Sequence, residues 1–396
     1  MTLPEIDEYK PSPDGRPPLA RAKGWDQRED GGIRDLNTMP GWAGSSWYFL
    51  RYPDAHNKEE FLDKEKAKYW LPIDLYVGGT EHAVGHLMYS RFWTMFLYDL
   101  GYVPTPEPFQ KLVNQGMIQG VSQMMYRDKK TNTYVSADMI EEGNQDQYSS
   151  IHANISFVKN NILDVDAQKK WAQEEDASFE FNANGEFHTT PLVEKMSKSK
   201  YNTIDPALMC EEYGADTLRL YEMFLGPLEV AKPWSTEGIS GVFSFLKRTW
   251  NLFTDAENQL DVSEEKANKA EFKALHTAIK QVEESIDRMA FNTAVPAFMV
   301  LAKELQQAKC NKREILEPFL VILSPFAPHF CEELWSMMGH QDSILKASFP
   351  EWKAAYLVED SITYPVQING KVRSKISVPS DADKKAVEEV ALADNN

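Results

Sequence analysis

The sequence of 396 residues predicts an α/β part, then an all-α helix bundle, then the start of a small α+β domain. The apolar run at residues 73–77, followed by Gly78-Gly79 and a helical pattern, predicts a short buried strand, a tight turn and a helix. Between residues 241 and 338, apolar residues recur three and four apart, as in packed amphipathic helices. Alternating residues on both sides of Asn369-Gly370 predict a β-hairpin, and a helix is predicted after it from Asp381 to Leu392. These three patterns together define the expected fold class.

The composition limits the classes of protein to which the chain can belong. Its 42 Lys and Arg residues against 60 Asp and Glu give a formal net charge of -18, so bulk positive charge cannot hold a nucleic acid and no DNA partner is expected. Three widely spaced cysteines, Cys210, Cys310 and Cys331, show neither disulfide nor zinc-site spacing, which is typical of a reducing cytoplasm. Because no apolar run reaches membrane-spanning length, we expect a cytoplasmic protein without a membrane partner.

Lysine and serine are concentrated at residues 195–200, which read KMSKSK. This segment has too little apolar content for a core, and its ammonium, hydroxyl and backbone N–H groups are donors suited to phosphate. A solvated basic turn is the alternative. Asp205-Pro206 shortly after it predicts a helix cap and a first helical turn, with the helix running through Leu218. A basic loop held against a framework is therefore the preferred interpretation.

The turn at Gly78-Gly79 joins the predicted strand to a helix that begins at Thr80-Glu81 and runs through Leu97. Backbone donors and the helix dipole converge at such a turn, where open α/β sheets bind ligands. His82 and His86 lie four residues apart on this helix and are expected to share one face. They could line a substrate pocket, form a structural pair or hold a metal ion. Since the spacing supplies no third ligand, no metal site is predicted.

Three further segments are less regular. Ser45 and Ser46 lie within an aromatic run at residues 42–50, where they could line a pocket or cap a helix. Residues 110–118 predict a strand that ends in a glycine turn. After it, residues 121–190 are polar and acidic with little periodicity, which predicts an inserted, small mixed or β-rich module.

Five motifs together resemble one protein family. KMSKS at residues 195–199 is similar to the signature loop of class I aminoacyl-tRNA synthetases. SPFAPH at residues 324–329 resembles the anticodon-binding bundle of the branch that handles aliphatic amino acids. GSSWY at residues 44–48, GGTEH at residues 78–82 with His86, and VQINGKVR at residues 366–373 resemble leucyl-tRNA synthetases of the bacterial type. The motifs occur in the family's order along nearly the whole chain, so a chance match is not expected.

The resemblance implies partners, a cofactor and a set of site residues. Leucine, tRNA-Leu and ATP with Mg²⁺ would be bound, and no protein-bound zinc is expected. Lys198 first and Lys195 next would be catalytic, because negative charge grows on the leaving pyrophosphate. The leucine pocket would contain Trp42, Ser45, Tyr48, His82 and His86. The ATP site would contain Gly78, Gly79, Glu81, His82, Gln115, Gly116, Met117, Ile118, Lys195, Met196, Ser197, Lys198 and Ser199.

The resemblance also implies a domain layout. Residues 1–34 would be a connector, 35–120 the second half of a Rossmann-like class I synthetase catalytic domain, 121–190 the inserted module, 191–236 the signature loop with linking helices, 237–355 the anticodon-binding helix bundle, and 356–396 a truncated α+β C-terminal domain. Basic residues of the bundle such as Lys247, Arg248 and Lys312 are candidate contacts for tRNA.

One signature of the class I family does not occur in the sequence. The family's His-x-Gly-His is not present, since the segment His82-Ala83-Val84-Gly85-His86 has one residue too many, and the editing domain is also missing. We therefore expect the C-terminal part of a leucyl-tRNA synthetase, inactive alone in leucine activation. A free-standing, non-catalytic tRNA-binding paralogue is the alternative. A metallohydrolase that uses His82 and His86 is a third interpretation, which bound metal would support.

Overall fold

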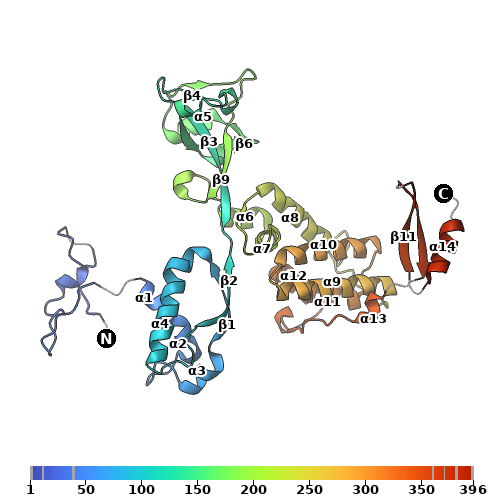
Figure 1. Cartoon of the computed structure of the whole chain (residues 1–396), viewed down its shortest axis with the longest axis horizontal. Coiled ribbons are helices and arrows are strands. Elements are labelled where there is room, and N and C mark those ends of the chain that lie inside the picture. Colours follow the sequence, from blue (N-terminus) through green and yellow to red (C-terminus); the bar gives the residue numbers. More distant parts are fainter. Residues whose placement is uncertain are drawn as a thin grey trace. The chain divides into compact units, whose positions relative to one another are not determined.

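The structure, a computed structural model, describes residues 3–10, 13–37, 41–358, 361–369, 371–379 and 382–393. The chain divides into two compact units, Met1–Gly116 and Met117–Asn396, which are described separately. Figure 1 shows the helices and strands of both units in chain order. Part of the predicted connector, Pro11-Ser12, part of the predicted hairpin turn, Gly370, and the predicted start of the last helix, Asp381, lie outside the described residues.

The first unit contains a two-stranded parallel sheet. Strand β1 (Ile73–Gly79) pairs with β2 (Phe109–Gln115), so that Gly78 lies beside Asn114. One regular helix was predicted after β1. The structure instead has a 3₁₀ turn, a π-helical turn and then an α-helix between β1 and β2. The elements of this unit are η1 (Pro18–Arg21), α1 (Trp42–Ser45), α2 (Tyr48–Arg51), η2 (Tyr52–Asp54), α3 (Lys64–Trp70), η3 (Thr80–His82), the π-helical η4 (Ala83–Leu87) and α4 (Met88–Asp99).

The prediction that residues 73–77 form a buried strand is wrong. Leu75, Val77 and Leu112 of the β1–β2 sheet are 44%, 40% and 42% exposed. Parallel strands are normally covered on both faces, and apolar content alone does not tell whether a cover is present. This unit therefore presents apolar sheet surface within the part of the chain that the structure describes. Its buried cluster consists of Phe49, Leu50, Leu62, Ala67, Leu71 and Val103.

The second unit begins with a six-stranded sheet around β3 (Ile118–Asp128). This strand pairs antiparallel with β5 on one side and with β9 on the other, and it continues across the predicted boundary at residue 120. Strands and one helix together agree with the prediction of a mixed, β-rich segment. The other elements here are β4 (Tyr134–Val135), η5 (Ala137–Met139), η6 (Gln145–Gln147), β5 (Tyr148–Ala153), η7 (Ile155–Phe157), β6 (Val158–Lys159), β7 (Ile162–Leu163), α5 (Val165–Ala172), β8 (Phe179–Glu180), β9 (Thr190–Lys195) and β10 (Lys232–Pro233).

The helix predicted after Asp205-Pro206 begins as expected but is interrupted. The carboxylate of Asp205 accepts a hydrogen bond from the N–H of Ala207 at 2.9 Å, which caps α6 (Pro206–Tyr213). Gly214 then has φ +88°, a conformation that a helix cannot contain, so a second helix, α7 (Ala215–Phe224), follows. The predicted single helix through Leu218 is therefore two helices.

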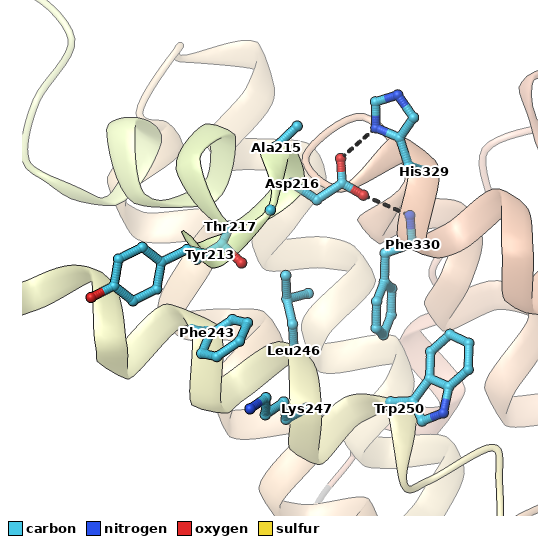
Figure 2. Close-up of a pocket in the computed structure, with 11 residues that line it drawn as sticks. Tyr213, Ala215, Asp216, Thr217, Phe243, Leu246, Lys247, Trp250, His329 and Phe330 are labelled. Atoms are coloured by element: carbon cyan, nitrogen blue, oxygen red, sulfur yellow. Dashed lines mark hydrogen bonds and ion pairs between the residues drawn. The ribbon is translucent and has the colours of Figure 1, made fainter. Parts of the chain in front are cut away.

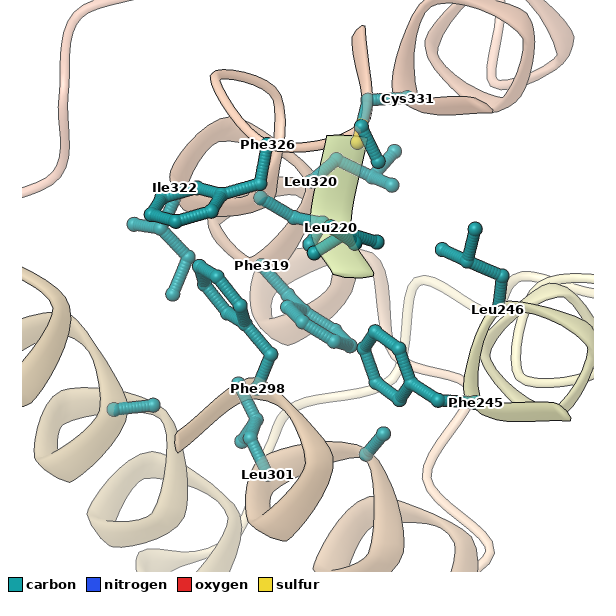
Figure 3. Close-up of a cluster of buried hydrophobic side chains, with 14 of the residues drawn as sticks. Leu220, Phe245, Leu246, Phe298, Leu301, Phe319, Leu320, Ile322, Phe326 and Cys331 are labelled. Carbon is teal, nitrogen blue, oxygen red and sulfur yellow. The ribbon is translucent and has the colours of Figure 1, made fainter. Parts of the chain in front are cut away.

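The predicted helix bundle is confirmed. Its members are α8 (Thr236–Trp250), α9 (Lys269–Asp287), α10 (Phe291–Gln307), α11 (Arg313–Leu323) and α12 (Pro328–Met337). Figure 3 shows Phe245, Phe298 and Phe319 meeting in the core, each at most 1% exposed. Burying a side chain of this size contributes about 1.5–3 kcal/mol. Leu220 of α7 reaches the same cluster, so the helix that follows the lysine-rich segment packs into the bundle core.

The C-terminal hairpin is also confirmed. β11 (Ser361–Ile368) and β12 (Lys371–Pro379) pair antiparallel, with Ile362 opposite Val378. The elements on either side are η9 (Ile344–Lys346), α13 (Ala354–Leu357) and α14 (Lys384–Ala393). Among the described residues, the helices are too short or too polar to cross a membrane.

Candidate functional site

The residues predicted for the leucine pocket come together in the first unit. Trp42 lies edge-on to His82 with ring centroids 6.5 Å apart, and Tyr48 stacks on His86 at 6.0 Å. Trp42 also packs against Gly85, where a Cβ would lie 3.5 Å from the indole. Ser45 behaves differently, because its hydroxyl donates to the carbonyl of Trp42 at 3.0 Å and so closes a helical turn. Four aromatic rings, rather than two serines, therefore form this surface.

Tyr76, which was not predicted from the sequence, connects two of these rings by hydrogen bonds. The hydroxyl of Tyr76 lies 2.6 Å from the hydroxyl of Tyr48 and 2.6 Å from Nε2 of His86. Burial lowers the pKa of His86, and burial together with the hydrogen bond to Tyr48 raises the pKa of Tyr76. Both groups are therefore neutral at pH 7, which keeps this wall free of charge. Tyr76 lies two residues before Gly78 on the predicted strand, so alternation along β1 could have identified it.

The two histidines have different surroundings. His86 is buried, and the hydroxyl of Ser90 lies 3.3 Å from its Nδ1, whereas the side chain of His82 is 45% exposed. The expected shared face is not that of a regular helix, because the segment between them is the π-helical η4. Among the described residues, no group of three or more His, Cys, Asp and Glu side chains could hold a metal ion. The metallohydrolase interpretation gains no support from this geometry.

The glycine turn places a carboxylate over the end of β1. A Cβ on Gly79 would lie 2.1 Å from Oε2 of Glu81, so only glycine allows the carboxylate to fold back over the strand end. Oε1 of Glu81 lies 3.7 Å from Nε2 of His82. The predicted ATP residues Gly78, Gly79, Glu81 and His82 thus form one contiguous turn in the first unit. On the next strand Oδ1 of Asn114, beside Gly78, is buried without a hydrogen-bond partner.

The other predicted ATP residues fall on either side of the division between the two units. Gln115 ends β2 and Gly116 ends the first unit. Met117 begins the second unit, where its carbonyl accepts from the N–H of Lys232 at 3.1 Å. Ile118 pairs with Lys232 in the β3–β10 ladder.

The lysine loop, defined here as Lys195–Lys200, follows β9 in the second unit. The side chains of Lys195 and Lys198 are exposed, and neither has an ionic partner among the described residues. Lys200 differs, because its ammonium group pairs with the carboxylate of Glu194. The hydroxyls of Ser197 and Ser199 lie 2.8 Å from each other. The loop therefore offers two free cations and two hydroxyls, as a phosphate-binding segment requires.

The SPFAPH motif lies at the start of α12, beside a hollow of about 420 Å³ (Figure 2). Asp216 of α7 points at this helix end: its Oδ2 accepts from the N–H of Phe330 at 2.6 Å, and its Oδ1 from Nδ1 of His329 at 2.9 Å. Asp216 thereby caps a helix distant in sequence, which no local pattern indicates. Arg219 adds a hydrogen bond from Nη2 to the carbonyl of Pro325 at 3.0 Å.

The candidate tRNA contacts on the bundle are not equivalent. Lys247 extends over the ring of Phe243 at 4.1 Å and lies at the edge of the hollow in Figure 2. The ammonium of Lys312 instead lies 2.9 and 2.8 Å from the two carboxylate oxygens of Glu271, and its side chain is only 16% exposed. The structure therefore assigns Lys312 to an internal ion pair and not to a free basic surface.

Two family models match the chain. The model described as "Anticodon-binding domain of tRNA ligase" matches residues 269–389, which contain helices α9 to α12. The model described as "tRNA synthetases class I (I, L, M and V)" matches residues 191–231, which contain the lysine loop. The matched regions contain three of the five motifs, namely KMSKS, SPFAPH and VQINGKVR.

Individual relatives show the same relationship. The leucine–tRNA ligase of Cytophaga hutchinsonii is 51% identical over 99% of this chain, and that of Amoebophilus asiaticus is 50% identical over 99%. The crystal structure of the ternary complex of Agrobacterium radiobacter K84 agnB2 LeuRS, tRNA and LeuAMS matches with a TM-score of 0.63 and 27% identity over 95% of this chain. The chain covers 42% of each ligase and 41% of the crystallised chain. The resemblance inferred from the motifs is confirmed.

Proposed function

Because this chain is homologous over nearly its whole length to part of the leucine–tRNA ligases, we propose that it supplies the lysine loop and the anticodon-binding bundle of such an enzyme. The enzyme would activate leucine with ATP to leucyl-adenylate and transfer the leucyl group to tRNA-Leu. The observation that carries this proposal is the pair of exposed ammonium groups on Lys195 and Lys198, within the segment that matches class I synthetases; neither group has an ionic partner in the part of the chain that the structure describes.

The chemistry explains why free lysines are needed. In leucine activation, a carboxylate oxygen of leucine forms a bond to the α-phosphorus of ATP. The bond from that phosphorus to the bridging oxygen breaks, and pyrophosphate leaves with the electron pair. A positioned ammonium group that meets the growing negative charge can lower the barrier by about 3–4 kcal/mol. We assign this role first to Lys198 and next to Lys195.

The first unit would supply the leucine and adenylate contacts. The aromatic faces of Trp42 and Tyr48 form an uncharged wall suited to the leucine side chain, with neutral His86 behind it. Gly78, Gly79 and Glu81 would meet the adenylate at the end of β1. The exposed apolar surface of the β1–β2 sheet agrees with a catalytic fold that is completed by further chain, since parallel sheets are covered on both faces.

Mg²⁺ would enter with the nucleotide. Among the described residues no cluster of carboxylate, imidazole and thiolate groups forms a metal cage, so the donor set fits a metal held mainly by phosphate oxygens. When bound, Mg²⁺ would neutralise part of the triphosphate charge. Residues of this chain would then act on the nucleotide, with the two free lysines providing the remaining positive charge.

Leucine-dependent ATP–pyrophosphate exchange tests the proposal. The chain covers 42% of the ligases, so we expect no exchange from the chain alone and exchange from the complete ligase polypeptide that contains it. In the complete enzyme, Lys198→Ala should lower kcat by about 10²–10³-fold. Lys159→Ala, which removes an exposed lysine of the inserted module, is the matched control and should change little. Robust exchange by the chain alone, or equal rates for the two variants, would contradict the proposal.

A non-catalytic tRNA-binding protein is the second candidate function. It is favoured by the match of the anticodon-binding model to residues 269–389, which does not require catalysis. Retention of tRNA-Leu by this chain should be compared with retention of a non-cognate tRNA at fixed salt, because salt controls the nonspecific part. Specific retention, with no exchange even from the complete polypeptide, would favour this function over the first.

A further inference from the structure

The lysine loop rests on three adjacent strands that bring a carboxylate, a hydroxyl and an imidazole to one face. Gly120 of β3 pairs with Glu194 of β9, and Met124 of β3 pairs with His152 of β5. Residues two apart on a strand point to the same side, so Glu194 and His152 share the face of Ser122, which lies between Gly120 and Met124. None of these residues was singled out from the sequence.

Glu194 is the centre of this cluster. Its Oε1 accepts from the hydroxyl of Ser122 at 2.5 Å and from Nε2 of His152 at 2.7 Å, while its Oε2 accepts from the ammonium of Lys200. The hydrogen bond from Lys200, and then that from Ser122, lower the pKa of Glu194 to about 2. The carboxylate is therefore ionised at neutral pH, and both oxygens are engaged.

A buried asparagine closes the loop onto the same strands. The amide of Asn202 donates from Nδ2 to the hydroxyl of Ser122 at 2.8 Å, and its Oδ1 accepts from the N–H of Ser197 at 2.8 Å. Asn202 is fully buried and occupies the space above Gly120, where a Cβ would lie 2.6 Å from the carbonyl oxygen of Asn202. The position of the loop thus depends on a glycine in β3 and on the hydrogen bond that Ser197 donates to Asn202, two residues beyond the end of the loop.

The inserted module also contacts Tyr201, the residue that follows the lysine loop. Tyr201 has φ +53°, and its carbonyl accepts from the N–H of Ile155 at 3.3 Å. The ring of Trp171 lies edge-on to Tyr201 with centroids 4.6 Å apart. Together with His152, these contacts mean that three residues of the inserted module touch either Glu194, directly before the loop, or Tyr201, directly after it.

We propose that Glu194 is a positioning residue that holds Lys200 as a structural counter-ion and thereby directs Lys195 and Lys198 towards the nucleotide, under the control of the inserted module through His152. This inference rests on the proposed function of the loop. The charge that Lys200 would bring to a phosphate is offset by the carboxylate of Glu194, with which its ammonium group is paired. Lys195 and Lys198, which have no ionic partner within the described ranges, are left to meet the triphosphate.

Hydrogen exchange of the chain tests the anchoring without any assay of activity. Glu194→Gln removes the charge that holds Lys200, and we expect exchange in residues 196–202 to accelerate about tenfold. His152→Ala removes one of three contacts and should accelerate the same residues about threefold. The matched control is Glu186→Gln, which breaks the Glu186–His188 pair of the same module, 3.0 Å long, and should leave the loop unchanged. Unchanged exchange in both Glu194→Gln and His152→Ala would refute the anchoring.

Steady-state kinetics of the complete ligase polypeptide separate positioning from loss of folded enzyme. We expect Glu194→Gln to raise the KM for ATP and lower kcat, each about tenfold, with the KM for leucine unchanged. A merely structural defect would lower kcat alone. If Lys200 acts only through Glu194, the double variant Glu194→Gln/Lys200→Gln should be no worse than Glu194→Gln. Additive effects would overturn the proposal. An inactive parent enzyme would instead refute the proposed function and leave the exchange result to decide the anchoring.

Discussion

Replacing Asp216 with alanine should destabilise the junction between α7 and the helix bundle by about 2 kcal/mol. Its side chain is 8% exposed and provides the cap that α12 otherwise lacks, because the residue before that helix is Ala327. Loss of a helix cap costs about 0.5–2 kcal/mol. The cap here is the bond that Asp216 accepts from the N–H of Phe330, 2.6 Å long, and because it is charge-assisted and mostly buried we expect the upper end of that range. The bond to His329 adds little, since that side chain is 79% exposed.

The measurement is urea unfolding of the chain followed by circular dichroism, combined with hydrogen exchange of residues 326–338. Local exchange is needed because the two units can unfold separately. Asp216→Asn keeps the shape and one acceptor, so it should cost about half as much as Asp216→Ala. Asp287→Asn, at an exposed carboxylate that ends α9, is the control and should stay within about 0.5 kcal/mol of the wild type. If Asp216→Ala behaves like this control, the capping argument fails.

Two further predictions concern ion pairs. Lys312→Met leaves the carboxylate of Glu271, whose side chain is 2% exposed, without its cation, which should cost about 3–5 kcal/mol in urea unfolding. Glu271→Gln combined with Lys312→Met should recover much of this loss, and failure to recover would show that Lys312 acts in another way. Bonds from Lys66 and then Asn57 lower the pKa of Asp54 to about 2, below its unfolded value of about 3.9. The stability that Asp54 contributes is therefore present above pH 4 and lost as the pH falls towards 2. Tryptophan fluorescence of Asp54→Asn should show a flatter acid transition than that of the wild type, and identical transitions would contradict the assignment.

Local sequence patterns correctly predicted the elements that depend on short-range apolar spacing and turn residues. Helix α11 (Arg313–Leu323) lies within residues 241–338, where the apolar spacing predicted helices, and the ladder of the hairpin extends to the pair of Ile368 with Lys371. Burial of β1 was predicted wrongly, because an apolar strand has the same sequence whether or not another layer covers it. The interruption at Gly214 was also missed, since the apolar spacing continues through a glycine that ends one helix and begins the next.

In the candidate site, too, some residues could be identified from the sequence and others only from the structure. Tyr48 and His86 were identified by resemblance and stack on each other, but Tyr76, which links Tyr48 to His86, was not identified. The role of Lys312 was misjudged because charge in a sequence does not reveal a partner 41 residues away. In general, residue type and spacing indicated which groups could act, and tertiary contacts determined which of them are free to act.

The lysine loop shows why this distinction affects function. Its lysines are chemically identical, and the sequence gives no physical reason to rank Lys200 below Lys198. The difference arises at Glu194, which binds one ammonium group and is itself held by Ser122 and His152 from two other strands. A substitution far from the loop in sequence, at His152, can therefore alter which cations are free without changing the number of lysines. For this reason, the positive charge of the loop is a property of the sheet beneath it as well as of the motif.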